Sequence, residues 1–323
     1  MFQFLKRYLI KSFLPAILVV TYLAFGLVQP QFLTGTNLIN ILRQSSYLIM
    51  LATAQLVVLI PRGFDLSVGP VIGTISVGAS MVMVGVAKGG AGSVLLAVVL
   101  AWLTALAIGF VVGAINGVAV AYFGVSPFMA TLGMMGIGLG FATTISGGFP
   151  VTGVPVEFVN VFARGNLLGL PVPVIVCIIV LALVHFMLQY TVLGRSLYLL
   201  GSSPRAAYVA GVPTRRRLAW AYVVCSMIVA VVALMLTART GTGEPRLGMS
   251  LMFESLMAAI IGGVSLAGGE GTILNCIIGG LFVTVLSNGM NLSGIDSNIQ
   301  LIILGTILIV TIVVDQLRIR IRI

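Results

Sequence analysis

The chain has 323 residues, of which 59% are hydrophobic and only 7% are charged. This composition excludes a water-soluble globular protein, in which roughly a quarter of the residues carry charge. The net charge of +10 would suggest nucleic-acid binding in a soluble protein, but in a membrane protein it reports orientation, because cytoplasmic loops collect Lys and Arg. We therefore expect an all-α, multi-pass membrane protein that does not bind nucleic acid.

Ten apolar stretches are candidates for membrane helices, since a spanning helix needs about 20 mostly apolar residues. In chain order they cover residues 12–28, 45–60, 66–87, 93–122, 127–145, 173–190, 219–237, 251–266, 272–286 and 299–314. The second, eighth and ninth stretches are short, which is typical of broken or re-entrant segments. The basic start of the chain leads into an apolar run without a small-residue cleavage site, so we interpret the first stretch as a retained spanning helix.

The basic residues favour an orientation with both chain termini in the cytoplasm. With ten crossings, the cytoplasmic side holds Lys6, Arg7, Lys11, Arg62, Arg195, Arg205, Arg215, Arg216, Arg217, Arg318, Arg320 and Arg322. The outer side holds only Arg43, Lys88, Arg164, Arg239 and Arg246. Because Lys and Arg concentrate in cytoplasmic loops, this arrangement is preferred over its inverse. We expect one transmembrane domain over residues 1–323, with a cytoplasmic loop at residues 191–218.

That loop is the one long polar interruption of the chain, and it contains five of the 17 basic residues. Ser203 is a good helix N-cap, Pro204 suits the first helical position, and Gly211 suits the helix end. The predicted helix, residues 204–210, is too short to be stable alone, because an isolated helix needs roughly 12 residues or more. Its small and aromatic side chains suit a groove on another protein. The alternative is an ordinary loop whose arginines only set the orientation.

Glycines recur at a spacing of four residues in three of the apolar stretches. They are Gly109, Gly113 and Gly117, Gly69 and Gly73, and Gly136 and Gly140. Small residues at this spacing allow two helix backbones to approach closely in lipid. We therefore expect a tightly packed bundle.

Sequence patterns of common catalytic and cofactor sites are absent from the chain. It contains no GxxxxGK[ST] phosphate loop, no HExxH metal motif, no DxxxD pair and no GxSxG nucleophile motif. His185 lies alone in an apolar stretch and is expected to be a core or cavity histidine. Cys177, Cys225 and Cys276 lie far apart in apolar runs and fit neither a disulfide framework nor a metal site. We expect no enzyme activity, metal or cofactor in this chain.

Polar residues at membrane depth are candidates for a solute path, because burying them in a membrane is costly. Asp65 lies between two apolar runs, where its carboxylate can cap the third helix, pair with Arg62, or contact solute at a broken helix. Amide side chains suit hydroxyl-rich solutes and equally suit hydrogen bonds between helices; they are Asn116, Asn275, Asn288 and Asn291. A glycine-rich segment at residues 261–272 loosely echoes residues 60–74, which leaves an internal repeat open.

Four ordered motifs can now be considered together. They are GFDLSVG at residues 63–69, Asn116-Gly117 followed by SPFMATLG at 126–133, the stretch 194–211 with Gly194-Arg195, Gly201 and PRAA at 204–207, and IGGVSLAGGEGT at 261–272 followed by Asn288-Gly289. Over nearly its whole length, the chain resembles the permease subunits of bacterial ABC importers for ribose and related monosaccharides. It departs from them at Arg62, where such permeases usually carry a second glycine.

The resemblance implies a multi-pass protein of the bacterial inner membrane that works within a larger complex. The partners would be a second permease subunit (an identical copy or a paralogue), two ATP-binding subunits and a periplasmic sugar-binding protein, with membrane lipid around the chain. ATP and magnesium would be held by the ATP-binding partners. The solute would be a monosaccharide such as ribose, galactose or xylose, and the short helix of the arginine-rich loop would be the coupling helix that docks on the ATPase.

Two sets of candidate residues follow from this hypothesis. Those expected to couple to the ATPase subunit are Arg195, Gly201, Pro204, Arg205, Ala206, Ala207, Tyr208 and Gly211. Those expected along the translocation path are Asp65, Ser67, Asn116, Phe128, Thr131, Ser265, Asn288 and Asn291. We expect Ala207→Glu, or deletion of residues 204–210, to abolish uptake while the protein still inserts.

The main alternative is a secondary carrier that works alone. That class commonly couples transport to a buried carboxylate or a sodium site, and the acidic candidates near helices are Asp65, Glu254 and Asp315. A membrane-embedded enzyme is a third hypothesis. The chain lacks the paired catalytic groups that such an enzyme needs.

Overall fold

The computed structural model describes residues 2–89, 93–167 and 169–321. Side chains are described from Leu14 to Val313, apart from residues 90–93 and 168. The basic side chains expected near the termini, Lys6, Arg7, Lys11, Arg318, Arg320 and Arg322, therefore lie outside the described residues, as does that of Asp315.

Helices account for most of the described chain. The long helices are α1 (Phe2–Val28), α2 (Gly35–Leu59), α3 (Val68–Ala87), α4 (Ser93–Ala121), α5 (Pro127–Ser146), α7 (Val172–Tyr190), α10 (Thr214–Thr240), α12 (Ile273–Leu292) and α13 (Ser297–Ile321). The shorter ones are η1 (Pro30–Leu33), α6 (Val156–Val159), the π-helical turn η2 (Asn160–Arg164), α8 (Val192–Ser202), α9 (Pro204–Val209) and α11 (Met249–Ile261). β1 (Asn166–Leu167) and β2 (Leu170–Pro171) form a small antiparallel hairpin in which Asn166 pairs with Pro171.

The lengths and composition of these helices are those of a polytopic membrane protein. Within the described residues, seven helices are long and apolar enough to cross a membrane: α2, α3, α4, α5, α7, α10 and α12. Three further apolar helical segments are shorter, namely Leu14–Val28, Met249–Ile261 and Ser297–Val313. The prediction of an all-α, multi-pass membrane protein is confirmed at this level.

The second apolar stretch is a full-length helix, so its prediction as a short segment at residues 45–60 was wrong. Helix α2 has 25 residues and begins at Gly35, where the Thr34 hydroxyl oxygen accepts a hydrogen bond from the backbone N–H of Asn37 at 3.3 Å. The polar start of the helix is accommodated because the Asn37 side chain is buried and donates to Asn288. Buried polar groups need such partners, and an apolar-run count cannot anticipate them.

The other two short stretches have different outcomes. The ninth, predicted at residues 272–286, is also a full-length helix, because α12 has 20 residues and continues to Leu292. The eighth, predicted at residues 251–266, is short as expected, since α11 has only 13 residues.

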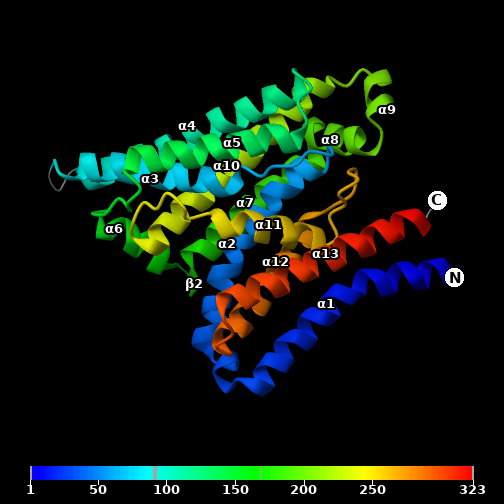
Figure 1. Cartoon of the computed structure of the whole chain (residues 1–323), viewed down its shortest axis with the longest axis horizontal. Coiled ribbons are helices and arrows are strands. Elements are labelled where there is room, and N and C mark those ends of the chain that lie inside the picture. The colour runs from blue at the N-terminus through cyan, green and yellow to red at the C-terminus, as the bar shows by residue number, and fades with distance from the viewer. Residues whose placement is uncertain (1, 90–92, 168, 322–323) are drawn as a thin grey trace.

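Helices α2 and α10 form the centre of the bundle. About five-sixths of the most apolar window of each is buried (83%), against 22% in α4, α5 and α7. Figure 1 shows α3, α4 and α5 grouped on one side of this central pair, with α12, α13 and α1 on the other side. Side chains of α2 and α10 therefore meet protein on most sides, and polar groups on them must be satisfied within the chain.

The predicted close approach of glycine-bearing helices is confirmed between α4 and α10. A Cβ added at Gly113 would lie 2.7 Å from the Cα of Val223 on α10. Gly109 and Gly117, one turn away on either side, meet the α10 backbone equally closely. The three glycines thus form the face on which α10 packs, as expected for small residues at this spacing.

The other two glycine pairs differ from each other. Gly69 and Gly73 on α3 lie directly against backbone atoms of Gly248 and Pro245, in the segment before α11, so close approach is confirmed there. The α5 pair, residues 136 and 140, was predicted to pack in the same way and does not, because an added Cβ at either position meets nothing within 4 Å. This face of α5 is open within the single chain.

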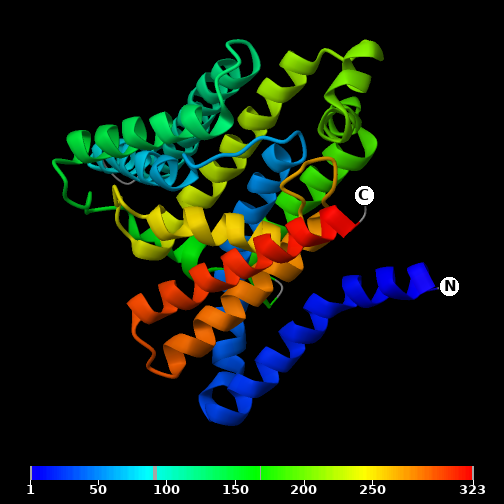
Figure 2. The ribbon, with the colours of Figure 1, turned by 45° about the vertical axis from the view of Figure 1, so that its right-hand side comes forward.

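The chain termini lie toward the same end of the bundle as α8 and α9. Figures 1 and 2 agree on this placement, in which the outer ends of α1 and α13 point to the side where α9 projects. The arginine-rich loop and the two termini therefore share one side of the molecule.

Candidate functional site

Helix α9 sits at the middle of the predicted cytoplasmic loop. The side-chain oxygen of Ser203 accepts a hydrogen bond from the backbone N–H of Ala206 at 3.2 Å, and Pro204 occupies the first helical position. Gly211 follows the helix with a φ of 72°, a left-handed conformation that favours glycine. The predicted helix and both of its boundary signals are present, and the helix ends one residue earlier than predicted, at Val209.

Most of α9 faces away from the rest of the chain. Tyr208 is 76% exposed and Val209 is 79% exposed, whereas Ala207 is fully buried. The helix thus lies beside α8 and α10 with Ala207 buried, and it presents an aromatic and a branched apolar side chain outward. An exposed apolar surface on so short a helix is typical of a docking site.

The segment before α9 is a helix that the sequence analysis did not predict. Helix α8 has 11 residues, and its N-cap Thr191 accepts from the backbone N–H of Gly194 at 3.3 Å. Gly194 lies directly on the backbone of Leu188 at the end of α7, so the chain turns sharply there without room for a side chain. Arg195, on α8, is exposed.

The end of α8 meets both glycine-rich segments of the sequence. A Cβ at Gly201 would overlap the carbonyl oxygen of Ile60, and it would lie 2.5 Å from the backbone nitrogen of Gly269. The Gly269 N–H also donates to the Ile60 carbonyl at 2.8 Å. Three backbone segments from distant parts of the chain therefore touch at one point, which we call the α8 junction (Ile60 to Arg62, Gly201 to Ser202, Gly268 to Gly269).

Arg62 strengthens this junction and does not pair with Asp65 as one interpretation of the sequence had it. Its Nε donates to the Gly201 carbonyl at 2.6 Å, and its Nη2 donates to the Ser202 carbonyl at 3.1 Å. These carbonyls belong to the last turn of α8, where the helix dipole favours a positive charge. The guanidinium thus acts as a C-terminal cap for α8.

Asp65, Ser67 and Asn116 form a buried polar cluster at the start of α3. Asp65 Oδ1 accepts from the backbone N–H of Ser67 at 2.8 Å and from its hydroxyl at 2.6 Å. The Asn116 side chain, on α4, donates to the Ser67 hydroxyl oxygen at 3.0 Å. The carboxylate therefore fixes Ser67, the residue before α3, and does not bond the first-turn N–H groups of the helix, so the predicted capping of α3 by Asp65 is not observed.

Two members of this cluster were missed because they lie within apolar runs. Gln55 Nε2, on α2, donates to the Asp65 carbonyl oxygen at 2.9 Å, and Cys225 Sγ, on α10, lies 3.8 Å from Asp65 Oδ2. Asp65 lies in the linker between α2 and α3, where burial raises the pKa of its carboxyl and the hydrogen bonds from Ser67 oppose that rise. The cluster joins α2, α3, α4 and α10 at one place.

Comparisons with known proteins identify the family. The family described as branched-chain amino acid transport system / permease component matches residues 37–312. The ribose import permease protein RbsC of Escherichia coli (strain K12) is 33% identical over 317 residues, covering 97% of this chain and 96% of that protein. The D-allose transport system permease protein AlsC of the same organism is 32% identical over 303 residues, covering 93% and 90%.

This chain belongs to the family of ABC importer permeases. A further relative, the galactose/methyl galactoside import permease protein MglC of Haemophilus influenzae, is 33% identical and covers 94% of each chain. No solved structure shows a significant match to the permease. The resemblance drawn from the four motifs is confirmed, and the permease is a multi-pass membrane subunit whose ATPase activity belongs to a partner subunit. This family membership decides against the stand-alone carrier.

The eight path candidates of the permease do not converge on one site. Asp65, Ser67 and Asn116 form the cluster described above. On α5, Phe128 is 48% exposed and Thr131 is buried, with its hydroxyl donating to a carbonyl of its own helix. Ser265 lies in the loop after α11, where its hydroxyl oxygen accepts from the backbone of a neighbouring turn residue.

The amide candidates near the end of α12 join helices. Asn288 accepts from Asn37 on α2 at 3.0 Å, and Asn291 Oδ1 accepts from Gln300 Nε2 on α13 at 2.8 Å. Asn275 forms a capping box with Thr272 at the start of α12. Interhelical and capping bonds therefore account for these side chains in the single chain.

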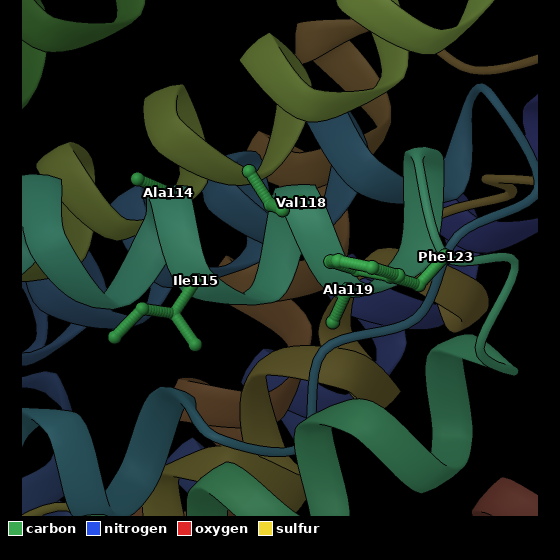
Figure 3. A pocket seen from close by; sticks show the side chains of 5 residues that line it. All are labelled: Ala114, Ile115, Val118, Ala119 and Phe123. Carbon is green, nitrogen blue, oxygen red and sulfur yellow. The ribbon is translucent and has the colours of Figure 1, made fainter.

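A shallow groove on α4 has a volume of about 390 Å³. Figure 3 shows its lining side chains, which are Ala114, Ile115, Val118, Ala119 and Phe123. None of them carries a polar side-chain group, so the groove offers no hydrogen-bond partner for a sugar hydroxyl. The described residues also contain no group of three or more His, Cys, Asp or Glu able to hold a metal ion.

Proposed function

We propose that this permease carries a monosaccharide across the bacterial inner membrane as one of two permease subunits in an ATP-driven complex. The relatives named above are permeases for ribose, D-allose and galactose or methyl galactoside, which supports a solute of this class. The complex would include a second permease subunit, two ATP-binding subunits and a periplasmic sugar-binding protein. The proposed topology has ten crossings and both termini in the cytoplasm.

The observation that carries the proposal is the outward face of α9. Tyr208 and Val209 are among the most exposed large apolar side chains in the described chain, and they stand on a helix far too short to fold alone. Arg205 on the same helix is exposed beside them. We assign this face to contact with the ATP-binding subunit, and we assign Ala207 to holding α9 on the permease.

The proposed topology is supported by the shared side of α9 and the two termini. Seven long apolar helices and three shorter ones supply the ten crossings. An even number of crossings before α8 puts the arginine-rich loop on the side of the N-terminus, where Figures 1 and 2 draw it. The positive charge of the loop then lies in the cytoplasm.

A second permease subunit would pack on the open face of α5. Gly133, Gly136 and Gly140 have no neighbour within 4 Å of an added Cβ, so another helix backbone can approach closely there. Phe128 is exposed near the start of the same helix. We propose that the solute passes between the two subunits beside α5, which keeps Phe128 as a path residue. Thr131 is fully buried within the single chain and does not face this path.

The test is co-purification of the permease with its ATP-binding subunit, combined with sugar uptake. Tyr208→Asp places a charge on the outward face of α9 without disturbing the buried Ala207, so insertion should be normal while ATPase binding and uptake are lost. Ala207→Glu is a poorer probe than the sequence suggested, because the buried alanine has no space for the longer side chain.

Tyr208→Phe is the matched control, since it keeps the ring and should retain both properties. Normal ATPase binding and uptake by the Tyr208→Asp variant would refute the assignment of α9. Uptake of D-ribose, D-allose and D-galactose by the wild-type complex then ranks the possible solutes.

A further inference from the structure

Arg62 occupies a backbone position that favours glycine. It follows the C-terminus of α2 with a φ of 65°, the one non-glycine residue with a positive φ in the described chain. The hydrogen bonds around it, from Gly63 N–H to the Val58 carbonyl at 2.7 Å and from Arg62 N–H to the Leu59 carbonyl at 2.9 Å, form a Schellman motif. The left-handed position of that motif is usually glycine, because a Cβ is strained there.

The Arg62 side chain reaches across the α8 junction. From this position the guanidinium bonds the Gly201 and Ser202 carbonyls, and the side-chain stem lies so close to Gly268 that a Cβ there would overlap Arg62 Cγ. One arginine therefore contacts both of the other segments of the α8 junction. A conformation kept against strain indicates a role for the residue that keeps it.

The junction is one residue away from α9. Ser202 is the last residue of α8, Ser203 caps α9, and α9 starts at Pro204. On its other side, Arg62 is followed three residues later by Asp65, whose cluster reaches α3, α4 and α10. A displacement of α9 thus has a short bonded route through Arg62 to the centre of the bundle.

We propose that Arg62 is a positioning residue that ties α9 to the linker between α2 and α3, so that movements of the ATPase subunit reach the bundle through the α8 junction. The proposal rests on the proposed function, because it takes α9 as the coupling helix. Arg62 touches neither solute nor nucleotide in it. The residue keeps α8 and the linker together while both move.

The experiment uses the complete complex in liposomes, with D-ribose, D-allose and D-galactose as test sugars. Uptake and ATP hydrolysis are measured in the same vesicles for Arg62→Gln, Arg62→Gly and Arg62→Lys. We expect the sugar transported per ATP hydrolysed to fall about five-fold in the Gln and Gly variants, the low end of coupling between distant sites. Arg62→Lys keeps one charged donor and should recover part of the loss.

Two features separate this role from simple support of the fold. Arg62→Gly removes the same guanidinium bonds as Arg62→Gln but relieves the strained backbone, so its melting temperature should be the higher of the two although its coupling is no better. Arg164→Gln, a matched change at an exposed arginine at the end of η2, should leave the ratio unchanged. A wild-type ratio in both Arg62→Gln and Arg62→Gly would overturn the proposal.

A cross-link gives an independent result. A variant with Arg62→Cys and Ser202→Cys loses the arginine bonds, so the sugar transported per ATP hydrolysed should be low. Joining the two thiols with a short bifunctional reagent should restore this ratio. Loss of uptake on cross-linking would show that α8 slides over the linker, which overturns the proposal. If the Tyr208→Asp variant keeps the ATPase bound and coupled, the assignment of α9 fails. If the Tyr208→Asp variant releases the ATPase while the Arg62 variants behave as wild type, only the Arg62 proposal fails.

Discussion

The side-chain amide of Asn37, near the start of α2, donates to Oδ1 of Asn288, near the end of α12, at 3.0 Å. The same amide donates to the Phe32 carbonyl at 2.9 Å, and both asparagines are buried. The bond joins residues 251 positions apart in the chain. It lets the polar ends of two helices lie inside a membrane protein without leaving an amide unpaired.

Asn37→Ala should lower the free energy of unfolding by about 1 to 3 kcal/mol, because it leaves a buried acceptor on Asn288 without a partner. A double-mutant cycle with Asn288→Ala should give a coupling of about 0.6 kcal/mol, the average for interhelical hydrogen bonds in membranes. Equilibrium unfolding of the detergent-solubilised protein measures both values. Strict additivity of the two substitutions would contradict a direct bond.

Gly113→Ala should destabilise the permease, because the added methyl meets the α10 backbone at the Cα of Val223. Overpacking of this kind typically costs about 1 to 3 kcal/mol. Gly136→Ala is the matched control, since α5 has open space at that position in the single chain and alanine is the better helix former. The melting temperature of the solubilised monomer should fall for the first variant and stay level or rise for the second; equal shifts would argue against the α4–α10 contact.

Asp65→Ala should cost about 1 to 3 kcal/mol of stability by removing the acceptor for the two Ser67 donors. Asp65→Asn should cost less stability. The amide oxygen can still accept a hydrogen bond, and a neutral amide does not carry the cost of burying a charge, which is the effect that raises the pKa of this carboxyl. Thermal unfolding of the two variants at neutral pH shows which substitution costs more stability. If Asp65→Asn proves the more damaging, the negative charge itself is required and the cluster binds a cation or a protonated group.

Thiol labelling tests the orientation without a cysteine-free background, since Cys177, Cys225 and Cys276 are all buried. Tyr208→Cys, on α9, should react with a membrane-impermeant maleimide only from the cytoplasmic side. Phe149→Cys, in the exposed segment after α5, should react only from the opposite side. Reaction of both cysteines from one side would contradict the proposed single crossing, α7, that separates them.

The helical bundle was predictable because apolar length reports the membrane directly. The count of apolar residues could not locate helix ends in which buried polar side chains bond to each other. The first ten residues of α2 are an example, because Asn37 there bonds to Asn288, far along the chain. The helix at Pro204 was found because its cap and its proline are local signals. Helix α8 was missed, although its N-cap Thr191 is a local signal of the same kind.

The buried cluster was half predictable for a similar reason. Asp65, Ser67 and Asn116 are polar residues in recognisable motifs, so they attracted attention individually. Gln55 and Cys225 stand inside apolar helices, and only the packing of α2 and α10 brings them to the carboxylate. The echo between the two glycine-rich segments has a physical counterpart, because Ile60 and Gly269 bond to each other at the α8 junction.

That junction also bears on how the protein is made. The contact between Gly201 and Gly269 can form only after Gly269 has been synthesised, because Gly269 lies in the last fifth of the chain. A nascent chain that has left the ribosome only through α10 would carry α8 without its contact to Gly269. The α8 junction, which lies one residue from α9, is therefore completed late in translation.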